Sequence, residues 1–326
     1  MLSGDRVRTL VFNCVPDKRV PRHKPKAMSS LHQKGKDTMN VKILLILSAF
    51  FLCLPVACKQ DIPKTTADIQ PVEHIYAVKD SSSLHVFVFT PTDTGKEKHP
   101  AIALIHGGGW AIGEPSWTFW QARHFAELGM VAVAAQYRLS DQKNITPLEA
   151  MADTRDVILW MRANADSLQI DPDKIAAYGW SAGGHLAAST AVFPDTACSI
   201  TSIPNALVLV SPAVTLAKDN WFKQMLLNRA EVASLSPDQH VRAGLPPTII
   251  LQGRTDTVTP LSEVQKFADN LAACGNRCEL IVYNGVGHMF TPSSIPDYNQ
   301  PQPDPAIQAD ANTKIDLFLK DLGYIK

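Results

Sequence analysis

Short apolar runs alternate with longer segments of helical spacing along most of the chain. Apolar runs of strand length lie at residues 84–89, 101–105, 131–135, 174–178, 206–210, 248–251 and 279–283, and helical periodicity at 117–128, 147–165, 182–191, 261–273 and 307–322. Continuously apolar strands that alternate with helices are typical of a parallel sheet covered on both faces. The pattern therefore predicts an α/β fold that binds ligands at the carboxyl ends of its strands.

The alternation is interrupted between residues 212 and 245. Trp221 and Phe222 lie there on a short predicted helix. The interruption directly follows the apolar run 206–210, where a strand's carboxyl end is expected. We expect this segment to form a small insertion or cap over the site.

The first 69 residues do not share the pattern of the fold. Residues 1–38 are polar and rich in Lys and Arg, and an apolar stretch follows at 43–54. That stretch is shorter than the roughly 20 residues of a membrane span and is typical of a secretory signal. We expect a start-site artefact or disordered leader over 1–38, with the true start at Met28 or Met39. A signal peptide over 39–57, a linker over 58–69 and one folded domain over 70–326 are expected to follow.

Cys58 directly follows Val56-Ala57 and resembles the lipidated cysteine of bacterial lipoproteins. We therefore expect export in a bacterium, to the periplasm or to an outer-membrane anchor on Cys58. Ordinary signal cleavage and a retained anchor are the alternatives, because Pro55 stands where the lipoprotein pattern has Leu. Exported proteins meet an oxidising compartment, so Cys274 and Cys278 form either a local disulfide or two free thiols.

Composition and charge exclude some partners. The chain has 31 Lys and Arg residues against 31 Asp and Glu residues. This balance does not support the concentrated basic face that nucleic-acid binding needs. Cys274 and Cys278 lack the further Cys or His partners of a zinc site. The glycine-rich stretches lack the lysine and hydroxyl of a phosphate-binding loop. We expect no nucleic-acid partner and no metal.

A G-x-S-x-G sequence, Gly179–Gly183, stands between a predicted strand and a predicted helix of small residues. A serine on such a tight turn is held with its hydroxyl exposed at the end of the sheet, and its neighbours must be small. Ser181 is therefore the predicted nucleophile. The alternative is a glycine-rich helix start with a serine at its N-terminus.

The serine needs a base and an acid, expected in the chain order Ser, acid, His. His288 lies in a flexible turn after the predicted strand 279–283, and Asp256 follows the predicted strand 248–251. We predict that His288 is the base and that Asp256 orients it. The weaker candidates are His185, which packs in or caps the helix after Ser181, His240, Asp195 and Asp219.

The sequence HGGGW, residues 106–110, follows another predicted strand. Glycine lets backbone N–H groups approach a substrate oxygen closely, and each such donor contributes about 2.7–4 kcal/mol to the transition state. Gly108, Gly109 and Ala182 are the predicted oxyanion donors, with His106 bracing the loop. Trp110, Trp180, Trp221 and Phe290 are predicted to line the pocket, and the proline-rich loop 292–305 to border it.

Together with Gly253–Pro260, these motifs resemble esterases of the α/β-hydrolase superfamily, in its hormone-sensitive-lipase-like and bacterial acetyl- or feruloyl-esterase-like branch. The resemblance covers roughly residues 70–326. It implies a central, mostly parallel eight-stranded sheet flanked by helices. It also implies ester hydrolysis through an acyl-enzyme, without metal or cofactor. The N-terminal cap helices of the lipase-like branch have no counterpart in the pattern, which favours an open site and short acyl groups.

The main prediction is a serine carboxylesterase for a small-molecule or oligosaccharide ester, such as an acetylated carbohydrate. Another hydrolase of the same fold, a peptidase or an arylformamidase, is one alternative. Superfamily peptidases carry a large extra domain for which the chain has no room. A non-catalytic binding protein is the other alternative. Such proteins commonly lose a triad member, whereas all three candidates are present here. The oligomeric state is left open.

Overall fold

The computed structural model describes residues 69–92, 98–141, 143–194, 200–297 and 300–326. The predicted leader, the signal peptide over 39–57 and the lipidated Cys58 lie outside these residues, as does nearly all of the predicted linker. No helix within the described residues is long and apolar enough to cross a membrane.

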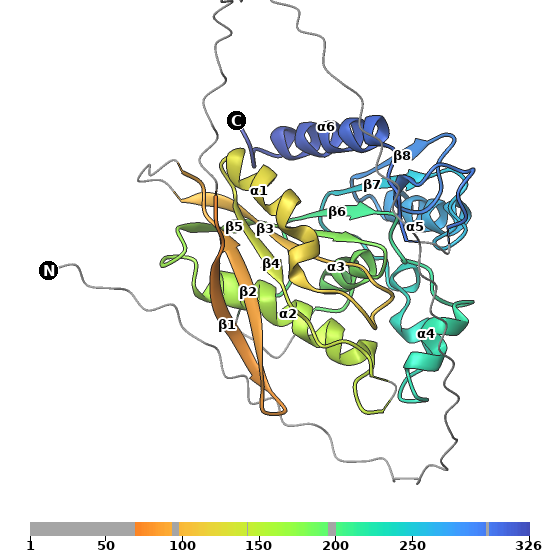
Figure 1. Ribbon diagram of the computed structural model, residues 1–326, viewed down its shortest axis with the longest axis horizontal. Helices are drawn as coiled ribbons and strands as arrows, with labels where there is room; N and C mark the ends of the chain where they lie inside the picture. The colour runs from red at the N-terminus through yellow and green to blue at the C-terminus, as the bar shows by residue number, and fades with distance from the viewer. Residues whose placement is uncertain (1–68, 93–97, 142, 195–199, 298–299) are drawn as a thin grey trace, which may run out of the picture. The chain divides into compact units, whose positions relative to one another are not determined.

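One eight-stranded sheet forms the centre of the described fold (Figure 1). Its strands are β1 (Val72–Lys79), β2 (Ser82–Phe89), β3 (His99–Ile105), β4 (Val131–Ala135), β5 (Ile170–Trp180), β6 (Ala206–Val210), β7 (Thr248–Gly253) and β8 (Cys278–Tyr283). They lie in the order β1-β2-β4-β3-β5-β6-β7-β8. β2 is antiparallel to β1 and β4, and the other neighbours are parallel. The predicted mostly parallel sheet is confirmed.

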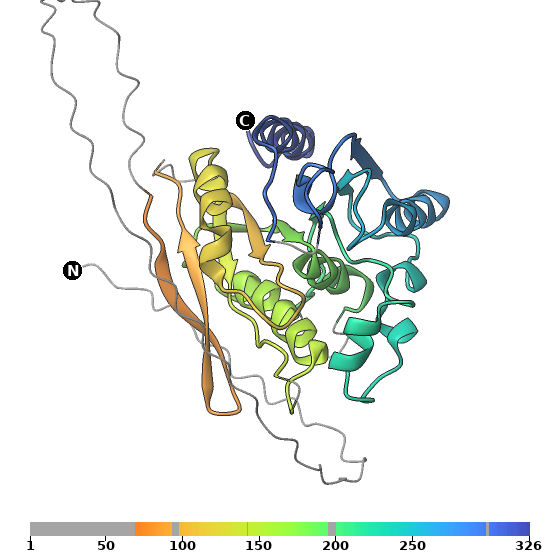
Figure 2. The ribbon, with the colours of Figure 1, turned by 45° about the vertical axis from the view of Figure 1, so that its right-hand side comes forward.

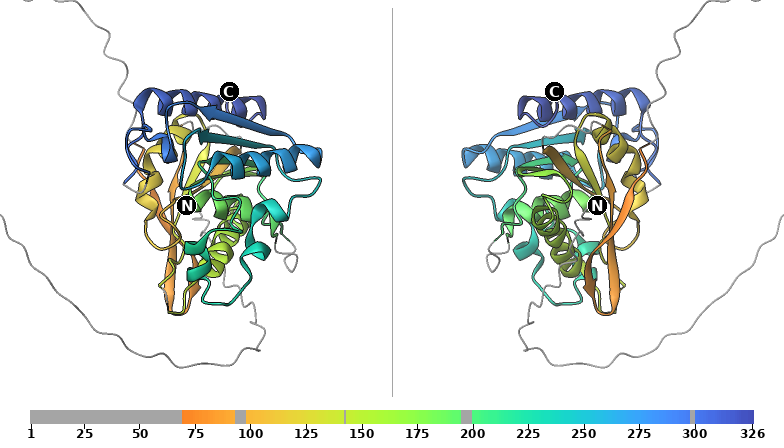
Figure 3. Two further views of the ribbon diagram at one scale, coloured as in Figure 1. Left: turned by 90° about the vertical axis from the view of Figure 1, so that its right-hand side faces the viewer. Right: turned by 90° about the vertical axis from the view of Figure 1, so that its left-hand side faces the viewer.

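Helices cover both faces of this sheet (Figure 2). They are α1 (Phe119–Glu127), α2 (Pro147–Ala163), α3 (Ala182–Val192), α4 (Asn220–Met225), α5 (Leu261–Ala273) and α6 (Pro305–Asp321). Buried side chains of α2, α3, α4 and α5 share one core cluster, and those of α1 and α6 share the other. The sheet between them is strongly twisted: in Figure 3, β1 runs nearly vertically and β8 nearly horizontally.

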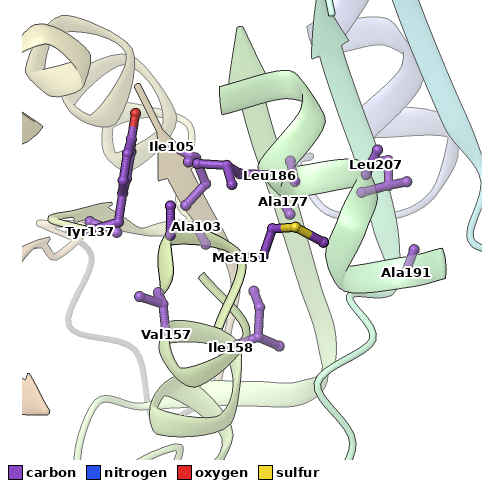
Figure 4. Packing of buried hydrophobic residues seen from close by; sticks show 14 of the residues in the cluster. Ala103, Ile105, Tyr137, Met151, Val157, Ile158, Ala177, Leu186, Ala191 and Leu207 are labelled. Atoms are coloured by element: carbon purple, nitrogen blue, oxygen red, sulfur yellow. The ribbon is translucent and has the colours of Figure 1, made fainter. Parts of the chain in front are cut away.

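The central strands are apolar on both faces because both faces are covered. Along β3, Ala103 and Ile105 belong to the first core cluster, whereas Ile102 and Leu104 belong to the second. Figure 4 shows the first cluster from close by, with Met151 among its labelled residues. This two-sided burial explains why the strands appear in the sequence as unbroken apolar runs rather than as alternating patterns.

Several elements differ from the sequence prediction in their bounds, and two of the differences have a local reason. The hydrophobic pattern gives no separate bounds for the edge strand β1. The reason is that most residues of β1 are exposed or half-buried. Helix α6 begins at Pro305 rather than at residue 307. The Asp304 carboxylate caps it, accepting hydrogen bonds from the N–H groups of Ala306 and Ile307, both at 3.0 Å.

Cys274 directly follows α5 as its C-cap residue, and Cys278 begins β8. Both are free cysteines in the structure, so the free-thiol alternative describes this pair. Burial is the main cause that raises the pKa of the Cys278 thiol to about 12. At neutral pH Cys278 is therefore protonated and unreactive as a nucleophile.

A buried carboxylate ties the edge hairpin to the rest of the fold. Asp153 on α2 is fully buried and accepts two hydrogen bonds from the Arg138 guanidinium, at 2.8 and 2.9 Å. Lys79, the last residue of β1, lies 3.2 Å from the same carboxylate. Its charge is thus balanced by two cations from different segments.

We predict that Asp153→Ala lowers the free energy of unfolding by about 1.5–3 kcal/mol, because it removes the buried carboxylate that Arg138 and Lys79 share, although each cation keeps a second carboxylate partner. Urea titration followed by circular dichroism measures this loss. Asp166→Ala is the control: Asp166 pairs with Lys98 on the surface, and its loss should leave the unfolding midpoint unchanged. A loss below about 1 kcal/mol for Asp153→Ala would contradict the prediction.

Candidate active site

Ser181 lies on a tight turn between β5 and α3. Its backbone has φ 53° and ψ −123°, a conformation that residues other than glycine rarely adopt. A Cβ on Gly183 would overlap the carbonyl oxygen of Ile105, and one on Gly179 would overlap the carbonyl of Gly183. The two glycines of the motif are therefore required by backbone-to-backbone contact, as the sequence predicted for such a turn.

The structure brings the three predicted triad residues together. His288 Nε2 lies 3.0 Å from Ser181 Oγ, and His288 Nδ1 lies 2.9 Å from Asp256 Oδ2. A proton on Nδ1 donates to the carboxylate, which leaves Nε2 to accept the serine proton. The geometry is that of a nucleophile, a general base and an orienting acid.

Four further donor groups hold the Asp256 carboxylate. Its Oδ1 accepts the N–H groups of Val258 and Thr259 at 2.9 and 2.7 Å. Its Oδ2 accepts the Thr259 hydroxyl at 2.9 Å and the Gln252 amide at 3.0 Å. The side chain is fully buried, so these bonds replace the water that a carboxylate otherwise needs. Sequence reasoning missed Thr259 and Gln252, whose only signal was a polar side chain near the acid.

Asp297 joins the acid turn to the base turn. One carboxylate oxygen accepts the N–H of His288 at 2.9 Å. The other accepts the N–H and the hydroxyl of Thr257, at 2.7 and 2.9 Å. Gly287 leaves room for this carboxylate, which a Cβ there would overlap. Asp297 belongs to the proline-rich loop after His288, so that loop contributes directly to the site.

The HGGGW loop has a backbone that only glycine adopts easily. Gly108 and Gly109 have φ +113° and +57°. Among the described residues, the N–H groups of Gly108, Gly109 and Ala182 make no hydrogen bond to a backbone acceptor. The indole N–H of Trp221 donates to the Gly109 carbonyl oxygen at 3.1 Å. These three N–H groups can therefore donate to a bound ligand, as the donors of an oxyanion hole must. Their role as oxyanion donors stays a prediction.

His106 braces the start of this loop. Its Nδ1 lies 2.7 Å from the Gly107 carbonyl oxygen, and its ring stacks on Tyr137 at 4.3 Å between centroids. The Tyr137 hydroxyl donates to the His106 carbonyl oxygen at 2.9 Å. Burial is the main cause that lowers the pKa of His106 to about 4. The ring is therefore neutral at pH 7 and acts by packing and hydrogen bonding.

A cavity of about 450 Å³ opens beside Ser181. Of the predicted pocket residues, Trp110 and Trp221 line it. Trp180 and Phe290 do not, which corrects the prediction for both. Trp180 stacks on Trp117, with ring centroids 6.2 Å apart, and Phe290 is fully buried against Tyr283. Both rings pack with the second core cluster, which involves α1 and α6, rather than in the cavity.

Of the weaker candidates, those within the described residues take no part in the side-chain hydrogen bonds of the triad. His185 is buried beside Trp110, and His240 packs against Phe193 with ring centroids 4.5 Å apart. Asp219 caps α4 by accepting the Phe222 N–H at 2.9 Å. Asp195 lies outside the described residues. Within the described part of the chain, His, Cys, Asp and Glu form no group of three or more that suits a metal ion.

The chain is similar in sequence to one family of esterases and to several ester hydrolases. The BD-FAE family model matches residues 87–271. The chain is 30% identical over 197 residues to the probable carboxylic ester hydrolase LipM of Mycobacterium tuberculosis, covering 53% of this chain and 44% of LipM. It is 26% identical over 216 residues to the probable isoprenylcysteine alpha-carbonyl methylesterase ICMEL1 of Arabidopsis thaliana, covering 58% and 45%. The chain thus spans less than half of these two relatives.

Among solved structures, the thermophilic esterase Est2 of Thermogutta terrifontis is similar along almost its whole length. The two chains are 33% identical with a TM-score of 0.70, and the match covers 78% of this chain and 94% of Est2. An Est2 structure phosphorylated by paraoxon is equally similar, at 33% identity and a TM-score of 0.69, with 78% and 95% covered.

We predict that Asp256→Asn lowers the reactivity of Ser181 by about 10⁴-fold. An amide N–H facing His288 Nδ1 would force the ring proton onto Nε2, which then cannot accept the serine proton. The rate of labelling by a fluorophosphonate measures this reactivity. Asp269→Asn, an exposed carboxylate on α5, is the matched control and should label at the native rate. Native-rate labelling of Asp256→Asn would contradict the assignment.

Proposed function

The chain belongs to the BD-FAE family and to the carboxylic ester hydrolases of the α/β-hydrolase fold, and from that premise we propose that it hydrolyses short acyl esters through an acyl-enzyme. One observation carries the proposal. Ser181, His288 and Asp256 form an unbroken chain of hydrogen bonds, and Ser181 opens into the cavity. Such a chain activates a hydroxyl that is otherwise a poor nucleophile.

In the first half-reaction, Ser181 Oγ attacks the ester carbonyl carbon and His288 Nε2 takes the hydroxyl proton. The carbonyl oxygen becomes an oxyanion, which the N–H groups of Gly108, Gly109 and Ala182 are proposed to stabilise. The intermediate then collapses: the bond to the alcohol oxygen breaks, and His288 gives its proton to that oxygen. The alcohol leaves, and the acyl group stays on Ser181.

In the second half-reaction, water repeats the attack. His288 Nε2 takes a proton from the water as its oxygen bonds to the acyl carbon. Collapse breaks the bond to Ser181 Oγ, which recovers the proton from His288, and the carboxylic acid leaves. Asp256 stays ionised throughout and stabilises the imidazolium form of His288. The four donor groups that hold its carboxylate support this role.

The size of the cavity and the solved relatives support a short acyl group. The cavity of about 450 Å³ lies in the range of pockets for small-molecule ligands and has to hold both the acyl and the alcohol part of an ester. Structures of Est2 with propionate bound and with butyrate bound are among the similar ones. Polar side chains of Lys218, Asp219 and Glu263 also line the cavity. They support a polar alcohol part, such as a carbohydrate.

We predict that Ser181→Ala lowers ester turnover by about 10⁶-fold, because the three residues act as a unit. Covalent labelling by a fluorophosphonate, read by mass spectrometry, should move from one adduct at Ser181 to none. Ser167→Ala, a serine that bonds the Asn164 carbonyl away from the triad, is the control and should react normally. Undiminished hydrolysis by Ser181→Ala would reject Ser181 as the nucleophile and favour a different site.

We also predict a preference for short acyl chains. On p-nitrophenyl esters, kcat/KM should be highest for acetyl to butyryl groups and fall for chains of eight carbons or more, because a long acyl chain and the alcohol part would compete for the same cavity. A panel of such esters, measured below their solubility limits, checks this. Faster turnover of the long esters would overturn the short-acyl proposal, and turnover of anilides or formamides alone would favour the other hydrolases.

A further inference from the structure

His185 links the two segments that carry the proposed oxyanion donors. Gly108 and Gly109 lie in the HGGGW loop after β3, whereas Ala182 is the first residue of α3. His185 lies one turn into α3 and is fully buried. The indole N–H of Trp110, at the end of the HGGGW loop, donates to His185 Nδ1 at 3.1 Å. A buried side-chain hydrogen bond therefore connects loop and helix.

The partners of His185 fix its tautomer. An indole N–H can only donate, so His185 Nδ1 must be the unprotonated, accepting nitrogen. The proton then lies on Nε2, which is 3.1 Å from the carbonyl oxygen of Leu235 and can donate to it. The Ser189 hydroxyl also lies 3.3 Å from Nε2. Burial is the main cause that lowers the pKa of His185 to about 4, so the ring is neutral at pH 7.

The same two rings are clamped from the insertion. Phe222 on α4 is fully buried and meets both rings edge-on, with centroids 4.8 Å from Trp110 and 5.3 Å from His185. The ring planes and the hydrogen bond are therefore held by one packed cluster. The insertion that the sequence singled out contributes here to the interior, through Phe222 and Leu235.

The HGGGW loop needs such an anchor because its backbone is strained. Trp110 has φ 60°, directly after Gly108 and Gly109 with φ +113° and +57°. A bulky residue in the left-handed region is strained and persists only where its surroundings hold it. The buried bond from Trp110 to His185 is such a restraint, and it acts on the residue next to Gly109.

We propose that His185 is a positioning residue for the oxyanion hole. By accepting the Trp110 N–H, it holds the Gly108 and Gly109 donors in register with the donor of Ala182. This inference rests on the proposed esterase function. Donors must lie within about 2.7–3.1 Å of a single oxyanion, and a misplacement of about 1 Å costs about 100-fold in rate. His185 meets Ser181 only through the backbone, its N–H donating to the Ser181 carbonyl oxygen at 3.3 Å, and its ring makes no hydrogen bond to the Ser181 hydroxyl within the described residues.

Two substitutions separate the two hydrogen bonds of the ring. In His185→Asn, the Oδ1 atom takes the place of Nδ1 and still accepts from Trp110. In His185→Gln, the Nε2 atom takes the place of the ring Nε2 and still donates to Leu235, but the acceptor for Trp110 is lost. We expect His185→Gln to lower kcat by about 10- to 100-fold with KM almost unchanged, and His185→Asn to retain most of kcat.

Trp110→Phe tests the same bond from the other side, since it keeps an aromatic ring and removes the N–H. The double variant Trp110→Phe with His185→Gln should lose no more kcat than either single variant, because both remove one interaction. His99→Gln is the control. His99 lies at the opposite end of β3, with Nδ1 3.0 Å from the Gly129 carbonyl oxygen, and the change should leave kcat and KM unaltered.

A trifluoromethyl ketone adds to the Ser181 hydroxyl and forms a tetrahedral adduct that carries an oxyanion. Its affinity therefore reports on the oxyanion hole and would not change if His185 only stabilised the fold. Its affinity should fall with kcat across the His185 variants while KM stays constant. Equal kcat for the Gln and Asn variants would overturn the inference, as would additive losses in the double variant. If His185→Gln does not fold, Trp110→Phe carries the same test. A native protein that neither hydrolyses esters nor binds the ketone would instead refute the proposed function.

Discussion

Helix α3 begins against the carbonyl oxygens of Ile105 and His106, and this contact is possible because residue 183 has no side chain. The approach brings three things to one point: the strained Ser181, the N–H of Ala182 and the start of the HGGGW loop. A Cβ at position 183 would push the helix off the end of β3 and separate them. The rest of the site depends on this backbone contact, which accounts for a glycine-rich sequence at two distant places in the chain.

Two buried carboxylates, Asp153 and Asp256, have different partners and different roles. Asp153 is balanced by Arg138 and Lys79 and holds the edge hairpin to α2. Asp256 is held instead by neutral donors and by His288. Because no Lys or Arg in the described part of the chain pairs with Asp256, its negative charge is available to an imidazolium formed at His288. The choice of partner thus decides whether a buried carboxylate stabilises the fold or supports chemistry.

Two neutral histidines flank the HGGGW loop. His106 holds its beginning through Gly107 and Tyr137, and His185 holds its end through Trp110. Burial lowers the pKa of both to about 4, so neither competes with His288 for the role of base at pH 7. The family relationship to esterases is consistent with a loop whose shape is fixed before substrate binds, since fixed donors need no reorganisation during the reaction.

The sequence by itself determined the alternation of strands and helices and the residues Ser181, Asp256 and His288, because each of these follows a recognisable strand and motifs are local. It also favoured a strand-to-helix turn at Ser181 over a plain helix start, because a predicted strand stands before it. Only the tertiary structure placed Gln252, Thr259, Asp297 and His185 around the site, and turned Trp180 and Phe290 away from it. These outcomes depend on the direction of side chains from segments far apart in the chain, which the order of residues does not contain.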